Sequence, residues 1–461
     1  MNIRKLKWKK ALCVVLTGIL CVMTPFTVKA EIYWPEAPEM NTPCAIVMEV
    51  NSKAVLYEKN ADETNYPASI TKIMTTMLAL EQCEMDEVVT FSDDAINKNE
   101  GSGIARDYDE QMTMEQCLYA VMLESANECS YAVAEHVGQK LGGDYHTFID
   151  LMNEKAKEIG CTNTHFNNSN GLPDPDHWLS TRDMALIAAE AYQNELFREI
   201  VGCRSYRIPP TNKHADITPL NNHHAMISNY KTAKYLYEYC TGGKTGFTQA
   251  AGSTLVTFAE KDGMALVCVV MRTNSTDQYL DTTSLFDYCF QNFQICSLAE
   301  YTGDGEESGA KGIMNNHESY VKLNNDAYVV LPITADVADM EMELKSTDLP
   351  DDTVAQLCYT YGGHMVGNVE VVPSKAVVEN NYFDLEKELS EKNVVEVKAS
   401  TLAVIALLFI LLIVAIVIAK IVYDNYYVIL HNMDIRKQRR SRFKPVRQKK
   451  KRWSKRDRMF K

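Results

Sequence analysis

The residues that could carry covalent chemistry begin with Ser69 and Lys72, three positions apart. In a helix, this spacing places the lysine one turn above the serine on the same face. A serine hydroxyl is a weak nucleophile that needs a close base, and a lysine amine can be that base only if burial or a nearby cation lowers its pKa. The start of a helix also offers free backbone N–H groups to a developing anion. The pair therefore predicts a nucleophilic serine.

The Ser-x-x-Lys spacing is weak by itself, because the chain contains five such pairs. Only Ser69 opens an apolar-periodic segment, and Pro67 and Ala68 precede it. The alternative is that Ser69 only caps a helix and that Lys72 is solvated. For the pair taken alone, that alternative stays open.

Two further motifs favour the enzymatic interpretation. Ser125-Ala126-Asn127 is the only Ser-x-Asn of the chain and stands at a break between two expected helices. Lys244-Thr245-Gly246 is the only Lys-Thr-Gly and precedes an expected pair of strands. Ser-x-x-Lys, Ser-x-Asn and Lys-Thr-Gly in this order form the motif set of penicillin-interacting serine enzymes.

The segment 67–75 resembles the active-site segment of the serine D-alanyl-D-alanine carboxypeptidases, the low-molecular-weight penicillin-binding proteins. The similarity covers roughly residues 40–385. It is carried by the segments 101–103, 125–136, 164–172, 180–185, 243–255 and, more weakly, 362–371. The resemblance implies an α+β or α/β fold of the penicillin-binding/β-lactamase-like transpeptidase type, in which helices flank an antiparallel sheet. It also implies a small all-β C-terminal domain.

The resemblance further implies roles for four residues in removing the terminal D-Ala from peptidoglycan stem peptides. Ser69 attacks the carbonyl between the two terminal D-alanines, and Lys72 takes its proton. Ser125 relays a proton toward the leaving amine. Asn127 binds the substrate amide and helps to fix Lys72.

The Lys-Thr-Gly motif supplies the remaining implied contacts with substrate. Lys244 and Thr245 bind the terminal carboxylate, and Gly246 completes the substrate-binding motif. The backbone N–H groups of Ser69 and Phe247 form the oxyanion hole. The resemblance implies no cofactor and no metal, and it implies that β-lactam antibiotics inhibit the enzyme.

Hydrophobic periodicity indicates the helices that position these motifs. Apolar residues recur at helical spacing from Ser69 onward, and Thr113 with Gln116 predicts a capping box for a helix that runs to about Leu123. Further helices are expected at residues 128–141, 148–159, 181–195 and 281–293.

Strands are expected near both ends of the motif-bearing region. Segments 45–49 and 54–57 begin it, and the apolar segments 253–259 and 264–271 flank a Lys261-Asp262-Gly263 turn. This organisation predicts a catalytic domain at 31–300. Short strands after a polar linker predict a β-rich domain at 313–385.

Both ends of the chain carry targeting signals. Residues 1–30 contain six Lys or Arg and no acid around a short apolar core, which predicts a secretory signal peptide cleaved after Ala30. Residues 400–422 are long and apolar enough to span a bilayer, and 386–399 form a charged stalk before them. The tail 423–461 carries fifteen basic residues against three acids, which predicts a cytoplasmic tail on a single-pass protein whose catalytic domain is extracellular.

Charge and cysteine content limit the other classes of function. The net charge is −14, and removing the two basic ends leaves −32 for residues 31–422, so nucleic-acid binding is not expected. Eleven of the thirteen cysteines follow the signal peptide, and their spacing shows no Cys/His cluster, which argues against a metal site. His214, His223 and His224 are expected at the surface.

Two alternatives to the carboxypeptidase remain. A β-lactamase would need an acid/base in the loop before Lys-Thr-Gly, where residues 164–180 hold Asp174 and Asp176 but no Glu. A membrane-held penicillin-binding scaffold with little catalysis is the other alternative. Release of D-alanine from a diacetyl-Lys-D-Ala-D-Ala peptide, together with labelling by fluorescent penicillin, would distinguish it from an enzyme.

Overall fold

A computed structural model describes most of the region between the two charged ends. The chain divides into two compact units, Met1–Glu379 and Asn380–Lys461, and the described residues all belong to the first. They are 33–98, 100–298, 321–323, 327–345 and 355–373. The expected signal peptide, stalk, membrane span and basic tail lie outside these ranges. Within them, no helix combines the length and the apolar character needed to cross a membrane.

A five-stranded antiparallel sheet forms the centre of the fold, in the order β2-β1-β11-β10-β9. The strands are β1 (Cys44–Glu49), β2 (Val55–Lys59), β9 (Cys240–Thr248), β10 (Gly252–Lys261) and β11 (Met264–Thr273). The expected turn between the last two strands is confirmed. Asp262 and Gly263 both have positive φ, of 52° and 82°, as a two-residue hairpin turn requires.

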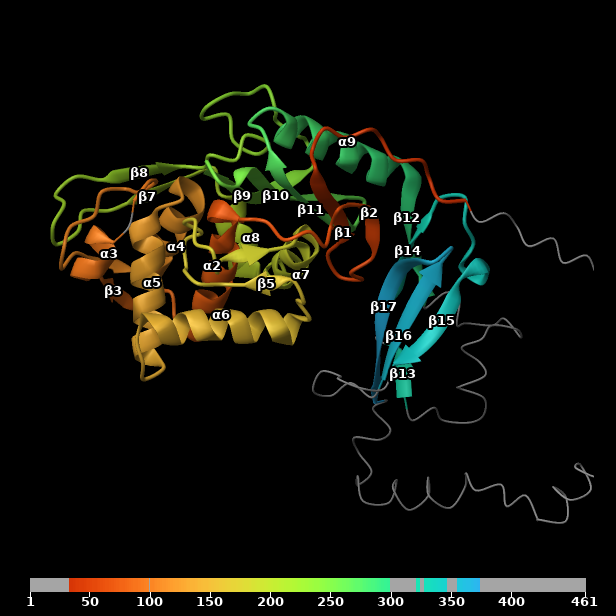
Figure 1. The fold of residues 1–461 in the computed structure, drawn as a ribbon, viewed down its shortest axis with the longest axis horizontal. Helices are drawn as coiled ribbons and strands as arrows, with labels where there is room; N and C mark the ends of the chain where they lie inside the picture. The colour runs from red at the N-terminus through yellow and green to blue at the C-terminus, as the bar shows by residue number, and fades with distance from the viewer. Residues whose placement is uncertain (1–32, 99, 299–320, 324–326, 346–354, 374–461) are drawn as a thin grey trace, which may run out of the picture. The chain divides into compact units, whose positions relative to one another are not determined.

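The three central strands of the sheet, β1, β10 and β11, are buried on both faces, which explains why they are mostly apolar without alternation. In β1, Cys44, Ile46 and Met48 face a core shared with the helices on one side. Ala45 and Val47 face a second core, shared with α9 (Asp277–Asn292). Figure 1 shows α9 on one side of the sheet and the other helices opposite it. The expected antiparallel sheet flanked by helices is therefore confirmed.

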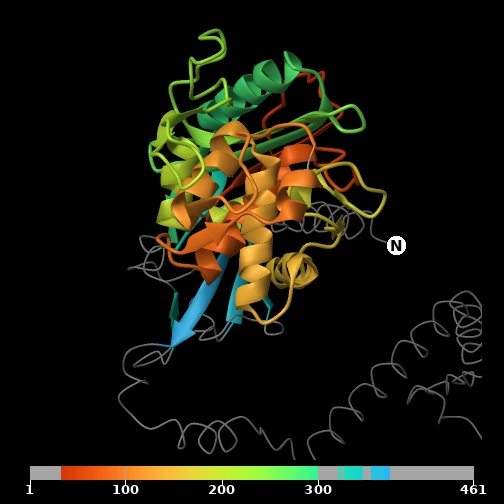
Figure 2. The ribbon, with the colours of Figure 1, turned by 90° about the vertical axis from the view of Figure 1, so that its left-hand side faces the viewer.

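The helices opposite α9 carry two of the three motifs. They are η1 (Ala68–Thr71), α2 (Lys72–Gln82), α3 (Asp93–Asn97), α4 (Met114–Tyr119), the π-helical turn η2 (Ala120–Glu124), α5 (Asn127–Lys140), α6 (Tyr145–Ile159), α7 (Thr181–Ala191) and α8 (Glu195–Gly202). The predicted capping box is confirmed, since the side chains of Thr113 and Gln116 each accept the other's backbone N–H, at 3.2 and 3.1 Å. Figure 2 shows this helical layer facing the viewer.

The helix expected at 281–293 begins four residues earlier, at Asp277. Two further helix boundaries differ from the predictions. The helix expected from Phe148 begins at Tyr145, because Asp144 caps it and accepts the backbone N–H of His146 at 2.8 Å. The helix expected at 181–195 is two helices, since Asn194 caps α8 and accepts the N–H of Leu196 at 2.9 Å. In both places a polar side chain accepts the free N–H groups at a helix start, and so begins a helix at a residue that the apolar periodicity did not indicate.

Three short antiparallel pairs lie among the helices: β3–β4, β5–β6 and β7–β8. Their bounds are Val88–Thr90, Gln111–Thr113, Thr164–His165, Trp178–Leu179, Ser205–Ile208 and Thr218–Asn221. The pair β5–β6 closes the polar loop 166–177 at its base, where Thr164 pairs with Leu179. This pairing fixes a long loop beside the catalytic motifs.

The described part of the C-terminal region consists of strands apart from one 3₁₀ turn, η3 (Val337–Asp339). β12 (Phe293–Ser297) pairs with β14 (Tyr328–Pro332), and a second sheet has the order β13-β17-β16-β15. The latter strands are β13 (Val321–Leu323), β15 (Glu341–Lys345), β16 (Ala355–Tyr361) and β17 (His364–Pro373). This second sheet and β14 share an apolar core that includes Val329 and Leu331 of β14. The domain limits 31–300 and 313–385 stay a prediction.

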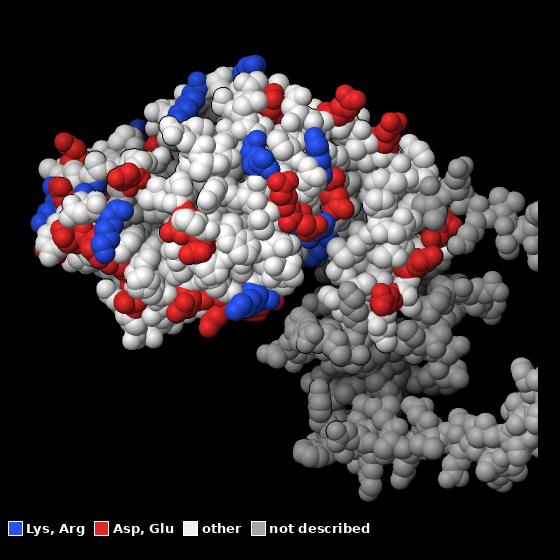
Figure 3. Space-filling model, in the orientation of Figure 1, with Lys and Arg blue, Asp and Glu red and all other residues white. Residues whose placement is uncertain are grey.

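Acidic and basic side chains are interspersed on the face shown in Figure 3. Arg182 contacts Asp62 at 2.7 Å and Glu58 at 2.5 Å, and Arg272 contacts Glu63 at 2.5 Å. Exposed pairs of this kind each contribute at most about 1 kcal/mol. The apolar cores, rather than these pairs, stabilise the fold.

Candidate active site

Ser69 and Lys72 meet as the helical spacing predicted. Ser69 lies in η1 and Lys72 is the first residue of α2, and the Nζ atom of Lys72 is 3.1 Å from the Oγ atom of Ser69. Lys72 is completely buried, whereas Ser69 is partly exposed between buried neighbours. The site therefore presents a reachable hydroxyl to solvent and keeps its neighbouring amine away from water.

Two further acceptors hold the Lys72 amine in place. Nζ lies 2.7 Å from Oδ1 of Asn127 and 2.7 Å from the backbone carbonyl of Asn170. Asn127 begins α5, and its Nδ2 donates to the carbonyl of Glu100, which fixes the orientation of the amide. The Ser-x-Asn motif therefore reaches Lys72 as predicted.

The environment of Lys72 lowers the pKa of its amine well below the usual value. Burial is the largest cause, because it disfavours the charged form, and the nearby positive charge of Lys244 acts in the same direction. Glu128 acts in the opposite direction and does not reverse the shift. A lowered pKa makes the amine available as a proton acceptor, as a general base requires.

Ser125 is held in an unusual conformation beside this group. It follows the π-helical turn η2 and has left-handed backbone angles of φ 62° and ψ 30°. Its Oγ atom is buried and has no hydrogen-bond partner among the described residues. Buried hydroxyls are rarely left unpaired, and a left-handed serine is strained. Both features fit a hydroxyl that is reserved for a substrate.

The Lys-Thr-Gly motif lies in β9, an edge strand of the sheet. Lys244 is buried and donates from Nζ to the backbone carbonyl of Thr245 at 2.8 Å. Burial lowers the pKa of this lysine to about 7. A second buried amine with a lowered pKa therefore lies near the first.

Gly246 allows β9 to approach Ser69 closely. A Cβ atom at this position would lie 2.9 Å from the backbone nitrogen of Ser69 and 2.3 Å from Oγ1 of Thr254. Thr254 in turn donates to the carbonyl of Pro67 at 2.8 Å, which ties the sheet to the segment that leads into Ser69. The side chain of the next residue, Phe247, is 68% exposed to solvent, so that β9 approaches Ser69 through its backbone.

The polar loop 166–177 contributes two contacts that sequence reasoning missed. Asn170 supplies the carbonyl on Lys72 described above. Gly171 has φ +85°, and a Cβ there would lie 1.8 Å from the carbonyl oxygen of Ala68. The sequence signal was the Asn-Gly pair, but nothing in the sequence indicated that this loop packs on the residue before the nucleophile.

His177 is the third residue that sequence reasoning missed. It is buried, and its Nδ1 atom accepts the backbone N–H groups of Asn167 and Asn168 at 3.0 and 3.3 Å. Its Nε2–H therefore donates to Oγ1 of Thr71 at 2.9 Å, and Thr71 donates to the carbonyl of Ala68 at 2.9 Å. Burial lowers the pKa of the ring to about 3, so it stays neutral. The relay supports Ala68, whose φ is +53°.

We expect His177→Ala to lower kcat more than it raises KM, because the relay positions Ser69 without contacting substrate. The expected loss in kcat is about 10-fold, corresponding to one misplaced hydrogen bond of about 1–1.5 kcal/mol. His177→Gln keeps a donor on that side and should recover part of the rate. The control is His146→Ala on the exposed side of α6. Equal changes in kcat for both variants would contradict a positioning role.

The three histidines expected at the surface behave differently from one another. His214 and His223 are partly exposed, and they contact Glu110 at 3.1 Å and Glu124 at 2.9 Å. The prediction for His224 is wrong: it is buried, with Nε2 3.0 Å from Oγ1 of Thr257. It packs under Gly243, where a Cβ would lie 2.8 Å from its Nε2. A buried histidine is thus part of the support for the Lys-Thr-Gly strand.

Comparison with known proteins agrees with this arrangement. Residues 32–275, more than half of the chain, match the peptidase family described as D-alanyl-D-alanine carboxypeptidase. The chain belongs to this family. Its members include D-alanyl-D-alanine carboxypeptidase DacF of Bacillus subtilis, which is 29% identical over 313 residues, or 66% of this chain and 76% of the relative. DacC of Escherichia coli is 32% identical over 252 residues, or 51% of this chain and 58% of the relative.

Solved structures share the fold. The DD-transpeptidase of Streptomyces K15 has a TM-score of 0.51 at 27% identity and covers 56% of this chain and all of its own. Penicillin-binding protein 5 of Haemophilus influenzae has a TM-score of 0.56 at 22% identity and covers 74% of this chain and 98% of its own. The second likeness extends beyond the motif-bearing region and concerns the fold alone.

Proposed function

We propose that this D-alanyl-D-alanine carboxypeptidase uses Ser69 as its nucleophile and Lys72 as the base that activates it. The observation that carries the proposal is the 3.1 Å contact between the Lys72 amine and the Ser69 hydroxyl in a buried site that lowers the pKa of the lysine. The amine takes the hydroxyl proton while Oγ forms a bond to the carbonyl carbon of the penultimate D-Ala.

The remaining motif residues complete the reaction in this proposal. The unpaired Ser125 hydroxyl passes a proton to the departing amine of the terminal D-Ala, and Asn127 binds the substrate amide. Lys244 and Thr245 bind the terminal carboxylate, and the N–H groups of Ser69 and Phe247 bind the oxyanion. Water then cleaves the ester and releases the shortened peptide. A β-lactam would form the same ester and stall at this step.

Release of D-alanine from diacetyl-Lys-D-Ala-D-Ala tests the activity, and mass spectrometry after treatment with penicillin tests the nucleophile. We expect turnover with the peptide and a penicillin adduct on the peptide that contains Ser69. Ser69→Ala should abolish both results, whereas Ser52→Ala, at a serine in the turn after β1, should change neither. An adduct on another residue would refute the proposed nucleophile. Labelling without release of D-alanine would favour the scaffold alternative.

A β-lactamase is less well supported than a carboxypeptidase. The two acids of the loop, Asp174 and Asp176, have local backbone contacts: Asp176 N–H donates to Asp174 at 2.8 Å, and the carbonyl of Asp174 accepts from His177. Asp176 is exposed. Neither acid has a contact with Ser69 that would mark it as the base for fast deacylation. A long-lived penicillin adduct is the expected result.

We also propose that residues 400–422 anchor the enzyme in the cell membrane, with the catalytic part outside and the basic tail 423–461 inside. The support is compositional, because the tail that follows the apolar segment is rich in Lys and Arg from Arg436 onward, and these residues resist translocation. Protease added outside intact cells should remove the catalytic part and leave a protected fragment that contains the tail. A chain ending near Asn393 should keep its activity on small peptides. Recovery of the tail among the external fragments would refute this topology.

A further inference from the structure

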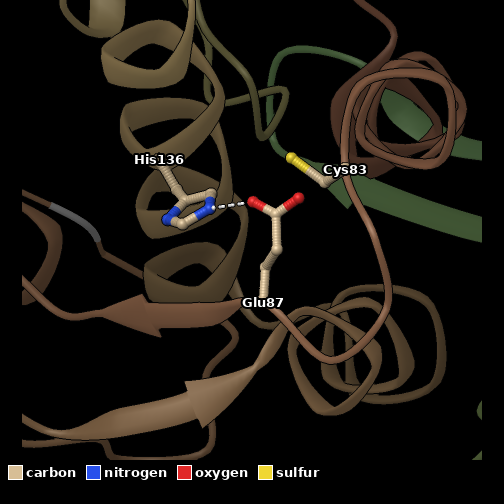
Figure 4. A group of neighbouring side chains, drawn as sticks. All are labelled: Cys83, Glu87 and His136. Atoms are coloured by element: carbon tan, nitrogen blue, oxygen red, sulfur yellow. Dashed lines mark hydrogen bonds and ion pairs between the residues drawn. The ribbon is translucent and has the colours of Figure 1, made fainter.

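The fold brings together three potential metal ligands that the cysteine spacing did not indicate. Cys83, Glu87 and His136 each offer one ligand atom, and these atoms all lie within 4.8 Å of one another. Figure 4 shows the three side chains converging, with the Glu87 carboxylate between the other two. Cys83 ends α2, Glu87 precedes β3, and His136 lies on α5. We propose that this cluster binds a divalent transition metal, most naturally Zn²⁺.

The donor set selects the class of metal. A thiolate, an imidazole and a carboxylate are typical zinc ligands, whereas Ca²⁺ and Mg²⁺ require oxygen ligands. Bonds of about 2.0–2.3 Å in a tetrahedral site place ligand atoms about 3.3–3.6 Å apart. The His136 Nε2 and Glu87 Oε2 atoms are 2.9 Å apart. A metal would therefore separate this pair by a few tenths of an ångström and draw the sulfur slightly inward.

The two oxygens of Glu87 have different environments, which suits a single metal bond. Oε1 accepts from the Lys140 amine at 2.5 Å and from the backbone N–H of Glu84 at 2.8 Å. Oε2 faces His136. Partners of this kind orient a ligating carboxylate from behind. The positive charge of Lys140 disfavours binding of a cation, whereas the negative charges of Glu84, Glu87 and the metal-bound thiolate favour it.

The cluster is only partly buried and remains accessible to solvent. Cys83 is 8% exposed, while the side chains of Glu87 and His136 are about a quarter exposed. Three protein ligands and an accessible fourth position for water complete a tetrahedral zinc site. The metal would join the end of α2 to the third turn of α5. The opposite ends of these two helices carry Lys72 and Asn127, about 16 Å away along α2 at 1.5 Å per residue.

Cobalt binding gives a direct test, because Co²⁺ in a site with a thiolate ligand has a sulfur-to-metal charge-transfer band. The full-length chain, without an affinity tag and kept reduced with a phosphine, would be titrated with Co²⁺ and then with Zn²⁺. We expect one equivalent of cobalt whose band is lost in Cys83→Ser and which Zn²⁺ displaces. His136→Ala and Glu87→Gln should weaken binding by more than the 10–100-fold typical of an outer-shell partner.

Two control variants and one measurement on the unaltered protein complete the test. Cys203→Ser and His146→Ala remove a partly exposed thiol and an exposed imidazole elsewhere and should leave the cobalt band unchanged. In the unaltered protein, Zn²⁺ should slow the alkylation of Cys83 at least tenfold relative to Cys203, as measured by peptide mass spectrometry. The labelling of each variant with fluorescent penicillin reports folding. A band that persists in folded Cys83→Ser, or alkylation of Cys83 that zinc does not slow, overturns the proposal.

Discussion

Lys72→Ala is expected to slow the acylation of Ser69 by penicillin by about 10²–10⁴-fold, the usual cost of losing a general base. The amine is 3.1 Å from the serine hydroxyl, and burial with the Lys244 charge lowers its pKa. Among the described residues, Lys72 is the base that forms a hydrogen bond with Ser69 Oγ. The rate is measured by stopped-flow or gel-based labelling with fluorescent penicillin at saturating and limiting concentrations.

The control for this variant is a second lysine with a lowered pKa. Lys53 lies in the turn between β1 and β2, with its Nζ atom 4.0 Å from Oε2 of Glu190, and burial also lowers its pKa. Lys53→Ala should label at the normal rate if proximity to Ser69, rather than loss of any lysine with a lowered pKa, is the cause. Thermal unfolding of both variants separates misfolding from loss of the base. Normal labelling of folded Lys72→Ala would contradict the proposed mechanism.

Lys244→Met is expected to lower kcat/KM for the D-Ala-D-Ala peptide by about 10–150-fold, which corresponds to a charged hydrogen bond of about 1.5–3 kcal/mol. Methionine fills most of the space of the buried lysine stem, so that the substitution removes the charge with little loss of packing. The same peptide with a C-terminal amide is the matched substrate. Because it lacks the carboxylate, the variant should lose much less rate on it than on the acid peptide, and any remaining loss reports the effect of the Lys244 charge on the pKa of Lys72.

The pH dependence of this reaction follows from the same lysine. Its pKa is about 7 in the free enzyme, so raising the pH above 7 removes the proton and with it the attraction for a carboxylate. We expect kcat/KM for the acid peptide to fall as pH rises through 7 and to approach a tenfold loss per unit. Lys244→Met should abolish this decline. A decline that persists unchanged in the variant would assign it to another group.

The contact between Ser69 and Lys72 was predictable from the sequence because it depends on a short spacing. Ser69 and Lys72 are three residues apart, so any helical backbone brings their side chains together. The order of the three motifs indicated the family, and apolar segments indicated the central strands and most helices. Local capping by Asp144 and Asn194 shifted two helix boundaries, because a polar side chain can satisfy helix N–H groups where periodicity carries no signal.

Contacts between distant segments were decided by the tertiary structure alone. The lowered pKa of Lys72 depends on burial and on Lys244, which is 172 positions later in the chain. His177 supports the segment 68–71 through Thr71, although the sequence carried no signal for it, and His224 lies buried under Gly243, although it was expected at the surface. The cluster of Cys83, Glu87 and His136 likewise forms only where α2 and α5 pack together. Sequence spacing determines which side chains are neighbours within one element, whereas packing between elements determines which charges lose their water and which distant donors meet.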